Sequence, residues 1–198
     1  LGAFSFHETK NIISGEGGML TINDDRFVDS AEIIWEKGTN RSQFFRGEIN
    51  KYGWVDTGSS FLPSEIISAF LWAQLENIES IQQKRLEIWL RYYEGLKDNK
   101  KIKLPNVPLN SSNNAHMFYI IVEDLETRSQ LIQKLKENHI LAVFHYLSLH
   151  KSEFYKGKHG NRTLCNSDRF EDCLLRLPLF YELEKNDQQK IIKIINEF

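Results

Sequence analysis

A short stretch near the start of the chain reads Phe4-Ser5-Phe6-His7-Glu8-Thr9-Lys10-Asn11, and the turn Gly15-Glu16-Gly17-Gly18 follows it. An apolar run typical of a strand ends here in polar residues and one lysine, and a second short apolar run follows the glycines. A lysine fixed at a strand end suits Schiff-base chemistry, because a held and partly desolvated amine can lose its proton and attack a carbonyl. On spacing alone, a solvated surface lysine is the commoner outcome.

As a string, the same residues resemble the lysine segment of the DegT-type nucleotide-sugar aminotransferases, which depend on pyridoxal 5'-phosphate (PLP). The likeness continues in the same order along most of the chain, and it looks most like the transaminases that make dTDP-4-amino-4,6-dideoxygalactose. The further blocks are Glu36-Lys37-Gly38-Thr39-Asn40-Arg41-Ser42-Gln43-Phe44-Phe45-Arg46-Gly47, Gly58-Ser59-Ser60-Phe61-Leu62, Asn114-Ala115-His116-Met117-Phe118-Tyr119, Val143-Phe144-His145-Tyr146 and Leu175-Arg176-Leu177-Pro178-Leu179-Phe180-Tyr181.

This resemblance implies an α/β fold: the C-terminal part of the large domain of a PLP transferase of fold type I, plus a small α/β C-terminal domain. We expect residues 1–61 to end the PLP-binding domain, residues 62–97 to form connecting helices, and residues 98–198 to form the small domain. In the family, much of the cofactor domain precedes the strand with which this chain opens. That preceding part should carry the ring that stacks on the pyridine, the acid that pairs with its nitrogen, and the first phosphate loop.

The resemblance also assigns the cofactor site. Lys10 would be the catalytic lysine that binds PLP and moves a proton, and Ser5 would bind the cofactor phosphate. Many relatives carry an asparagine after the glycine that corresponds to Gly58, and that asparagine contacts the partner's cofactor phosphate. Here Ser59 and Ser60 follow the glycine, so a phosphate contact from these serines is the expectation that replaces it.

Four further residues are candidates for substrate binding. Arg41 and Arg46 lie in a long aromatic-rich loop, residues 39–61, and guanidinium groups match phosphate oxygens; the alternative is that both are solvated or salt-bridged. By resemblance this loop lies at a homodimer interface. His145 and Tyr146 end a predicted strand and could bind sugar hydroxyls or diphosphate, although a strand-end histidine is often structural.

Composition sets broad limits. The chain has 198 residues, a net charge of −2 and 41% hydrophobic residues, which offers no electrostatic case for nucleic acid or an anionic membrane. No apolar run approaches the ~20 residues of a membrane span. Cys165 and Cys173 read as reduced thiols of a cytoplasmic protein, and no histidine or cysteine spacing indicates a metal site.

Hydrophobic periodicity predicts the remaining elements. A helix should start at Asp24-Asp25, bury Trp35 and stop at Gly38, and a helix from Pro63 should be buried on more than one side. The later elements are a second connecting helix (81–96), a strand (117–122), a helix (126–138), a strand (140–146) and a final helix (184–198) with a buried isoleucine stripe.

Two functions follow. The first is PLP-dependent transamination of a nucleotide-linked 4-keto-6-deoxy sugar, with glutamate as the amino donor. The rival is a catalytically incompetent piece that serves only structure or dimerisation, because the ring, acid and phosphate loop named above precede this stretch in the family. The resemblance, not any spacing, carries the substrate, the donor and the homodimer.

Overall fold

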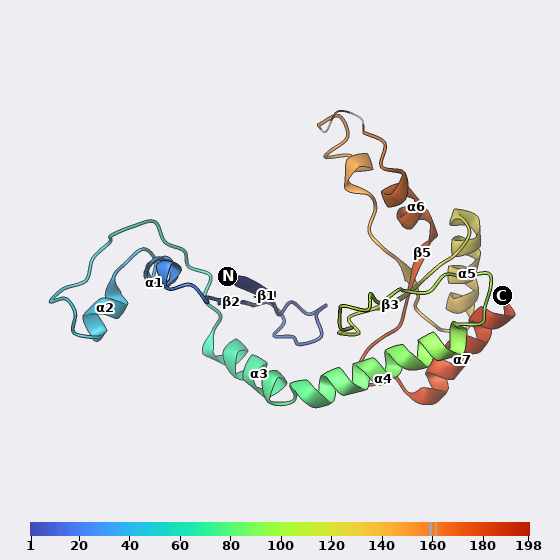
Figure 1. Ribbon diagram of the computed structural model, residues 1–198, viewed down its shortest axis with the longest axis horizontal. Coiled ribbons are helices and arrows are strands. Elements are labelled where there is room, and N and C mark those ends of the chain that lie inside the picture. Colours follow the sequence, from blue (N-terminus) through green and yellow to red (C-terminus); the bar gives the residue numbers. More distant parts are fainter. Residues whose placement is uncertain (159, 161) are drawn as a thin grey trace. The chain divides into compact units, whose positions relative to one another are not determined.

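The computed structural model describes residues 1–158, 160 and 162–198, and it is a mixture of helices and short strands (Figure 1). The chain divides into two compact units, Leu1–Ile78 and Glu79–Phe198. The division falls inside the segment expected to connect two domains, after the first residue of its second helix. Each unit is described by itself.

The first unit opens with an antiparallel hairpin of β1 (Gly2–Ser5) and β2 (Gly18–Thr21), in which Ser5 lies opposite Gly18. Two more backbone hydrogen bonds continue the ladder beyond the strands: Phe6 N–H to the Gly17 carbonyl at 2.9 Å, and Glu8 N–H to the Gly15 carbonyl at 2.8 Å. Gly15 has φ +80°, a left-handed conformation that glycine adopts without strain. The hairpin therefore ends in an ordered turn.

A helical segment follows the hairpin, as predicted. A 3-10 turn, η1 (Asp25–Phe27), leads into α1 (Val28–Trp35), and the Asp24 carboxylate caps the turn by accepting the Arg26 N–H. The segment stops where Lys37 and Gly38 take φ values of 63° and 83°, which confirms the glycine stop.

The loop after α1 closes on itself. It contains one short helix, α2 (Arg41–Phe45), and both Val55 N–H and Asp56 N–H donate to the Gly38 carbonyl, at 2.9 and 3.2 Å. Gly38 and Gly58 lie so close that a Cβ on Gly58 would sit 1.9 Å from the Gly38 nitrogen. Only glycine permits this contact.

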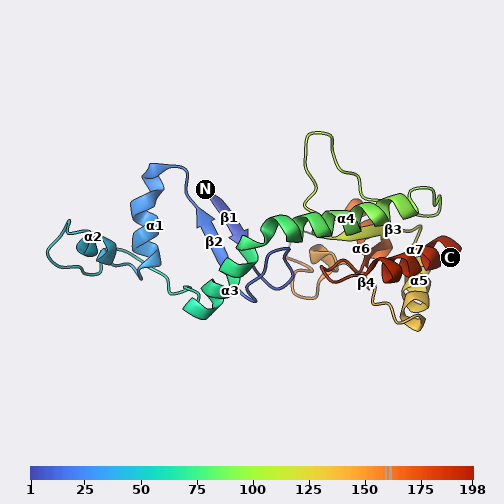
Figure 2. The same cartoon turned by 90° about the horizontal axis from the view of Figure 1, so that it is seen from below.

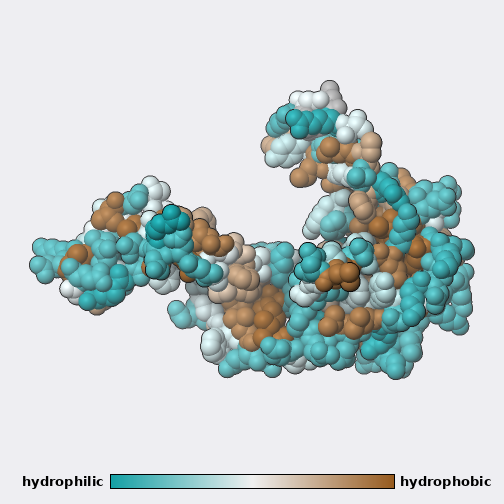
Figure 3. All heavy atoms as spheres, viewed as in Figure 1, coloured by the Kyte–Doolittle hydropathy of each residue, from teal (hydrophilic) through white to brown (hydrophobic). Residues whose placement is uncertain are grey.

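The two connecting helices are α3 (Glu65–Glu76), capped by the Ser64 hydroxyl, and α4 (Ile78–Leu96). The expected burial of α3 and of Trp35 is wrong within this chain: α3 has no buried residue, and Trp35 is 55% exposed. Figure 3 shows hydrophobic side chains gathered on the surface around α3 and the hairpin. The first unit presents more apolar faces than its own elements can cover.

The second unit is built on an antiparallel sheet of three strands in the order β3-β5-β4. The strands are β3 (Phe118–Ile121), β4 (Val143–Phe144) and β5 (Leu174–Leu177). Its helices after α4 are α5 (Leu125–Glu137), η2 (Leu149–Lys151), α6 (Cys165–Cys173) and α7 (Lys185–Glu197). Figures 1 and 2 both show α4 and α7 side by side. None of the described helices is long and apolar enough to cross a membrane.

The core of this unit forms where α4, α5, α7 and the sheet meet. Tyr92 and Phe118 are fully buried and stack with ring centroids 5.0 Å apart. The Tyr92 hydroxyl donates to the Pro178 carbonyl at 2.9 Å, and burial raises the pKa of this phenol. The predicted isoleucine stripe of the last helix is confirmed at Ile191, Ile194 and Ile195.

Two differences from the predicted elements concern the sheet. The strand expected over 140–146 is only Val143–Phe144, because β4 pairs with β5 at these two residues alone. Beyond it, the Ser148 N–H donates to the side chain of Glu171 at 2.9 Å. Neither α6 nor β5 was anticipated, although β5 is the central strand. Cys165 and Cys173 are free thiols, the first exposed and the second buried.

The glycine contact makes a testable prediction. We expect Gly58→Ala to open the loop, because overpacking costs about 1–3 kcal/mol, and to raise the rate of limited trypsin cleavage after Arg41 and Arg46 roughly tenfold or more. Gly53→Ala is the matched control, since nothing lies within 4 Å of a Cβ built there. Equal cleavage rates in the two variants would show that the close approach does not hold the loop.

Candidate active site

Lys10 lies at the tip of the hairpin, on the turn that joins β1 to β2. Its backbone N–H donates to the His7 carbonyl at 2.9 Å, so residues 7–10 form a closed turn. Its side chain is exposed, and among the described residues its amine makes no hydrogen bond or ion pair. The chain therefore fixes the backbone of Lys10 and leaves its amine available.

The turn is held by side chains that the sequence analysis did not single out. His7 Nδ1 lies 3.2 Å from the Thr9 backbone nitrogen and 3.0 Å from the Thr9 hydroxyl, and His7 Nε2 lies 3.4 Å from a Glu16 carboxylate oxygen. Ser14, which is 5% exposed, donates its hydroxyl to the Glu16 carbonyl at 2.9 Å. These residues lie within or beside the quoted lysine segment, so the position of His7 in that string was the available clue.

The donors on the hairpin fit PLP. The cofactor offers an aldehyde, which a free primary amine can attack, and a phosphate, which accepts hydrogen bonds. Lys10 would supply the amine. Ser5 is exposed at the end of β1, where its Oγ accepts the His7 N–H at 3.5 Å, and among the described residues its hydroxyl proton has no acceptor. Lys10 and Ser5 thus lie on one hairpin, as the resemblance implied.

The two arginines of the loop are occupied by carboxylates. Arg46 donates to Glu32 at 2.8 Å and to Glu48 at 2.7 Å, and these bonds raise its pKa, with Glu48 the larger cause. Arg41 lies 3.7 Å from Glu36 and stacks over a phenylalanine ring. The structure therefore shows the salt-bridged alternative, and phosphate binding by either arginine stays a prediction.

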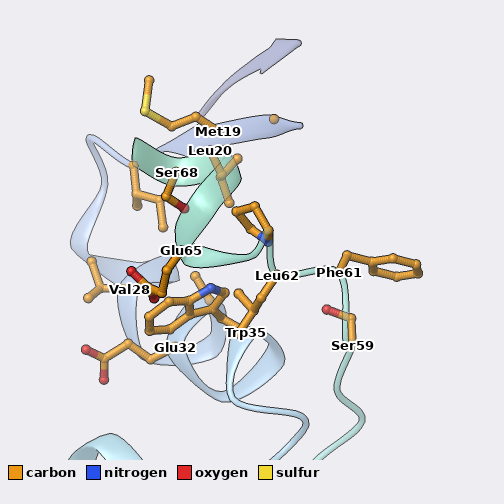
Figure 4. Close-up of a pocket in the computed structure, with 14 residues that line it drawn as sticks. Met19, Leu20, Val28, Glu32, Trp35, Ser59, Phe61, Leu62, Glu65 and Ser68 are labelled. Atoms are coloured by element: carbon orange, nitrogen blue, oxygen red, sulfur yellow. The ribbon is translucent and has the colours of Figure 1, made fainter. Parts of the chain in front are cut away.

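The two serines after Gly58 differ. Ser59 is half-buried and donates both its backbone N–H, at 2.9 Å, and its hydroxyl, at 3.4 Å, to the Ile34 carbonyl of α1, whereas Ser60 is exposed. Ser59 borders a largely apolar hollow of about 610 Å³ (Figure 4). In that view Phe61 points away from Trp35, which forms part of the opposite side. Because the lining is largely apolar, the hollow does not offer a phosphate-binding site beside Ser59.

In the second unit, His145 and Tyr146 leave the end of β4 and line a hollow of about 330 Å³. Their ring centroids are 5.0 Å apart. Burial, and secondarily the charge of Arg176, lowers the pKa of His145, so the neutral ring is favoured. Its Nδ1 is buried with no partner among the described residues. His145 therefore presents a neutral ring at the hollow, with one nitrogen buried and unpaired.

Glu171 of α6 shapes the same hollow, and sequence reasoning missed it. Its carboxylate accepts the Ser148 N–H at 2.9 Å, and Ser148 and Ser167 share a hydroxyl contact at 3.0 Å. The hydroxyl of Ser148, followed by its N–H, lowers the pKa of Glu171. No repeat or motif marks Glu171, because its role depends on a helix that packs beside a loop. Across the described residues, no group of three or more histidine, cysteine, aspartate or glutamate side chains could hold a metal ion.

Comparison with known proteins identifies the class. The profile of the DegT/DnrJ/EryC1/StrS aminotransferase family matches residues 1–196, so the chain belongs to this family. It is 24% identical over 98% of its length to the spore coat polysaccharide biosynthesis protein SpsC of Bacillus subtilis. It is 26% identical over 95% of its length to the UDP-4-amino-4,6-dideoxy-N-acetyl-beta-L-altrosamine transaminase of Helicobacter pylori.

A solved sugar aminotransferase from Streptococcus pneumoniae, in its PLP form, matches 98% of this chain with a TM-score of 0.80 at 24% identity. The predicted fold class is confirmed: the chain has the α/β fold of part of such an aminotransferase. It spans about half of each of these proteins: 52% of the B. subtilis protein, 49% of the H. pylori protein and 50% of the S. pneumoniae chain.

Glu171 yields a prediction for stability against pH. Glu171→Ala leaves the buried Ser148 N–H without an acceptor, which should lower the free energy of unfolding at pH 7 by about 1 kcal/mol. Because the folded pKa of Glu171 is lowered, the carboxylate's contribution is present above its ordinary pKa of about 4.3 and is lost as the pH falls through the folded value.

Urea unfolding of wild type and Glu171→Ala, at pH 7 and near pH 3, measures both effects. The gap between the two proteins should narrow at the acid pH. Glu171→Gln is the control, since it keeps an acceptor that does not titrate. An equal gap at both pH values would contradict the assignment.

Proposed function

We propose that this chain is the lysine-bearing part of a PLP-dependent aminotransferase that acts on a nucleotide-linked 4-keto-6-deoxy sugar in surface polysaccharide biosynthesis. The observation that carries the proposal is Lys10: a free amine on a turn held by its own hydrogen bonds, within a sequence of the DegT/DnrJ/EryC1/StrS family. The names of the curated relatives support a sugar substrate and a polysaccharide product.

PLP, when bound, supplies an electrophilic aldehyde and a ring that withdraws electrons from the carbon bearing the amino group. Lys10 would hold the cofactor through Nζ, and the same nitrogen, once released, would move a proton at the substrate carbon. Ser5 would donate its free hydroxyl proton to the phosphate. Ser60, and Ser59 after giving up its long bond to Ile34, would add donors from the loop.

Substrate phosphates would be bound by Arg41 and Arg46. Both ion pairs are exposed, and exposed pairs are worth little, so a phosphate can replace a carboxylate at small cost. His145, through its ring, and Tyr146, through its exposed hydroxyl, would contact sugar hydroxyls or diphosphate in the hollow that both line.

For the details we propose a dTDP-linked acceptor, glutamate as the donor, and a homodimer that works in the cytoplasm. One curated relative is named for a UDP-linked sugar, so acceptors with either nucleotide belong in the assay.

A structural or dimerisation piece without activity is the second candidate. It is favoured by the exposure of the first unit: Lys10 lies in solvent, and Ile66 and Trp72 of α3 are 82% and 64% exposed. We therefore expect little or no turnover of glutamate with a dTDP- or UDP-linked keto sugar by this chain alone, and measurable turnover would refute the second candidate.

The cofactor assignment is tested by a visible spectrum with added PLP, then borohydride reduction and mapping of the labelled lysine by mass spectrometry. We expect the band of lysine-bound PLP and a label concentrated on Lys10. Lys10→Arg should lose both, because a guanidinium does not form the bond, and the control Lys100→Arg, in a charged surface turn, should lose neither. A label spread over surface lysines would favour the structural candidate.

A further inference from the structure

We propose that His7 is the positioning residue for Lys10: its ring holds the turn from which the lysine projects. This inference rests on the proposed function only for the use to which Lys10 is put. The hydrogen bonds themselves are properties of the chain without cofactor.

The inner contact of His7 defines its tautomer. A backbone N–H can only donate, so the Thr9 N–H, 3.2 Å from His7 Nδ1, requires that Nδ1 carry no proton. The Thr9 hydroxyl lies 3.0 Å from the same nitrogen. The ring thereby accepts from the backbone two residues further on, as an asparagine does in an Asx turn.

The outer contact fixes the other side of the ring. The remaining proton must be on Nε2, which lies 3.4 Å from a Glu16 carboxylate oxygen on the opposite arm of the hairpin. Glu16 is in turn held through its carbonyl by the buried hydroxyl of Ser14. A Cβ on Gly17 would lie 2.5 Å from that hydroxyl, which explains a glycine there.

The turn connects His7 to Lys10 through a backbone hydrogen bond. The His7 carbonyl accepts the Lys10 N–H at 2.9 Å, so His7 bonds its backbone to Lys10 and its ring to Thr9, the residue before it. Both ring nitrogens are engaged, and neither is left for a ligand. The geometry therefore gives His7 a role in placing Lys10, not in touching the cofactor.

Three variants test whether the His7 ring holds the turn. His7→Ala removes the ring contacts with Thr9 and Glu16. His7→Asn restores an acceptor for the Thr9 N–H, since asparagine forms the same local turn. Glu8→Ala is the matched control: Glu8 is the exposed neighbour, and among the described residues only its backbone N–H forms a bond, to the Gly15 carbonyl.

The first readout is amide hydrogen exchange at Thr9 in the chain without cofactor. Loss of one hydrogen bond should speed this exchange about fivefold to tenfold in His7→Ala, with near wild-type rates in His7→Asn and Glu8→Ala. The second readout is the share of borohydride-fixed PLP label found on Lys10 in each variant. It should fall severalfold in His7→Ala and recover in His7→Asn.

Unchanged Thr9 exchange in His7→Ala would overturn the proposal, and so would faster exchange with an unchanged Lys10 share. If wild type itself shows no preference for Lys10, the proposed function fails. The exchange pattern at Thr9 then still decides whether His7 holds the turn.

Discussion

The pairing of the hairpin beyond its two strands is the constraint on which the candidate site depends. Phe6 and Glu8 donate to the carbonyls of Gly17 and Gly15, so the ladder continues into the turn that carries Lys10. Gly15 has a left-handed backbone, and a Cβ on Gly17 would lie 2.5 Å from the Ser14 hydroxyl, so both positions favour glycine in this arrangement. Gly15 and Gly17 thus help to determine the shape of the turn from which Lys10 projects.

The two units differ in how much of their apolar surface they bury. The second unit encloses Tyr92 and Phe118 among three helices and a sheet, and its buried polar Gln188 donates to the Ile88 carbonyl at 2.6 Å. In the first unit the backbone of the hairpin and of the loop forms many hydrogen bonds, yet α3 and Trp35 remain exposed. In the first unit, therefore, the backbone is well hydrogen-bonded although many apolar side chains remain exposed.

Sequence reasoning succeeded where one local cause decides the outcome. The stop at Gly38 and the isoleucine stripe of α7 follow from backbone freedom and a helical period. It failed where the cause is distant. Trp35 looks like a core residue on any helical wheel, but burial also requires a partner surface. The strand before Tyr146 ends at Phe144, and beyond it the Ser148 N–H donates to the side chain of Glu171, which lies on α6, a helix that was not predicted. The string around Lys10 predicted which lysine to consider, and the contacts of His7 with Thr9 and Glu16 required coordinates.

Several blocks of family likeness in the second unit have structural causes. Arg85 of α4 donates to the carbonyls of Ala115 and His116 at 3.2 and 2.7 Å, and Ala115 has φ 49°, so the Asn114–Tyr119 block keeps a strained turn against a buried guanidinium. Pro178 in the last block accepts the bond from Tyr92. Such blocks identify the fold but give no information on which sugar is bound. The segment from His145 is different, because it lines a hollow, and the hydrogen bond from the Ser148 N–H to Glu171 helps to hold that segment in place.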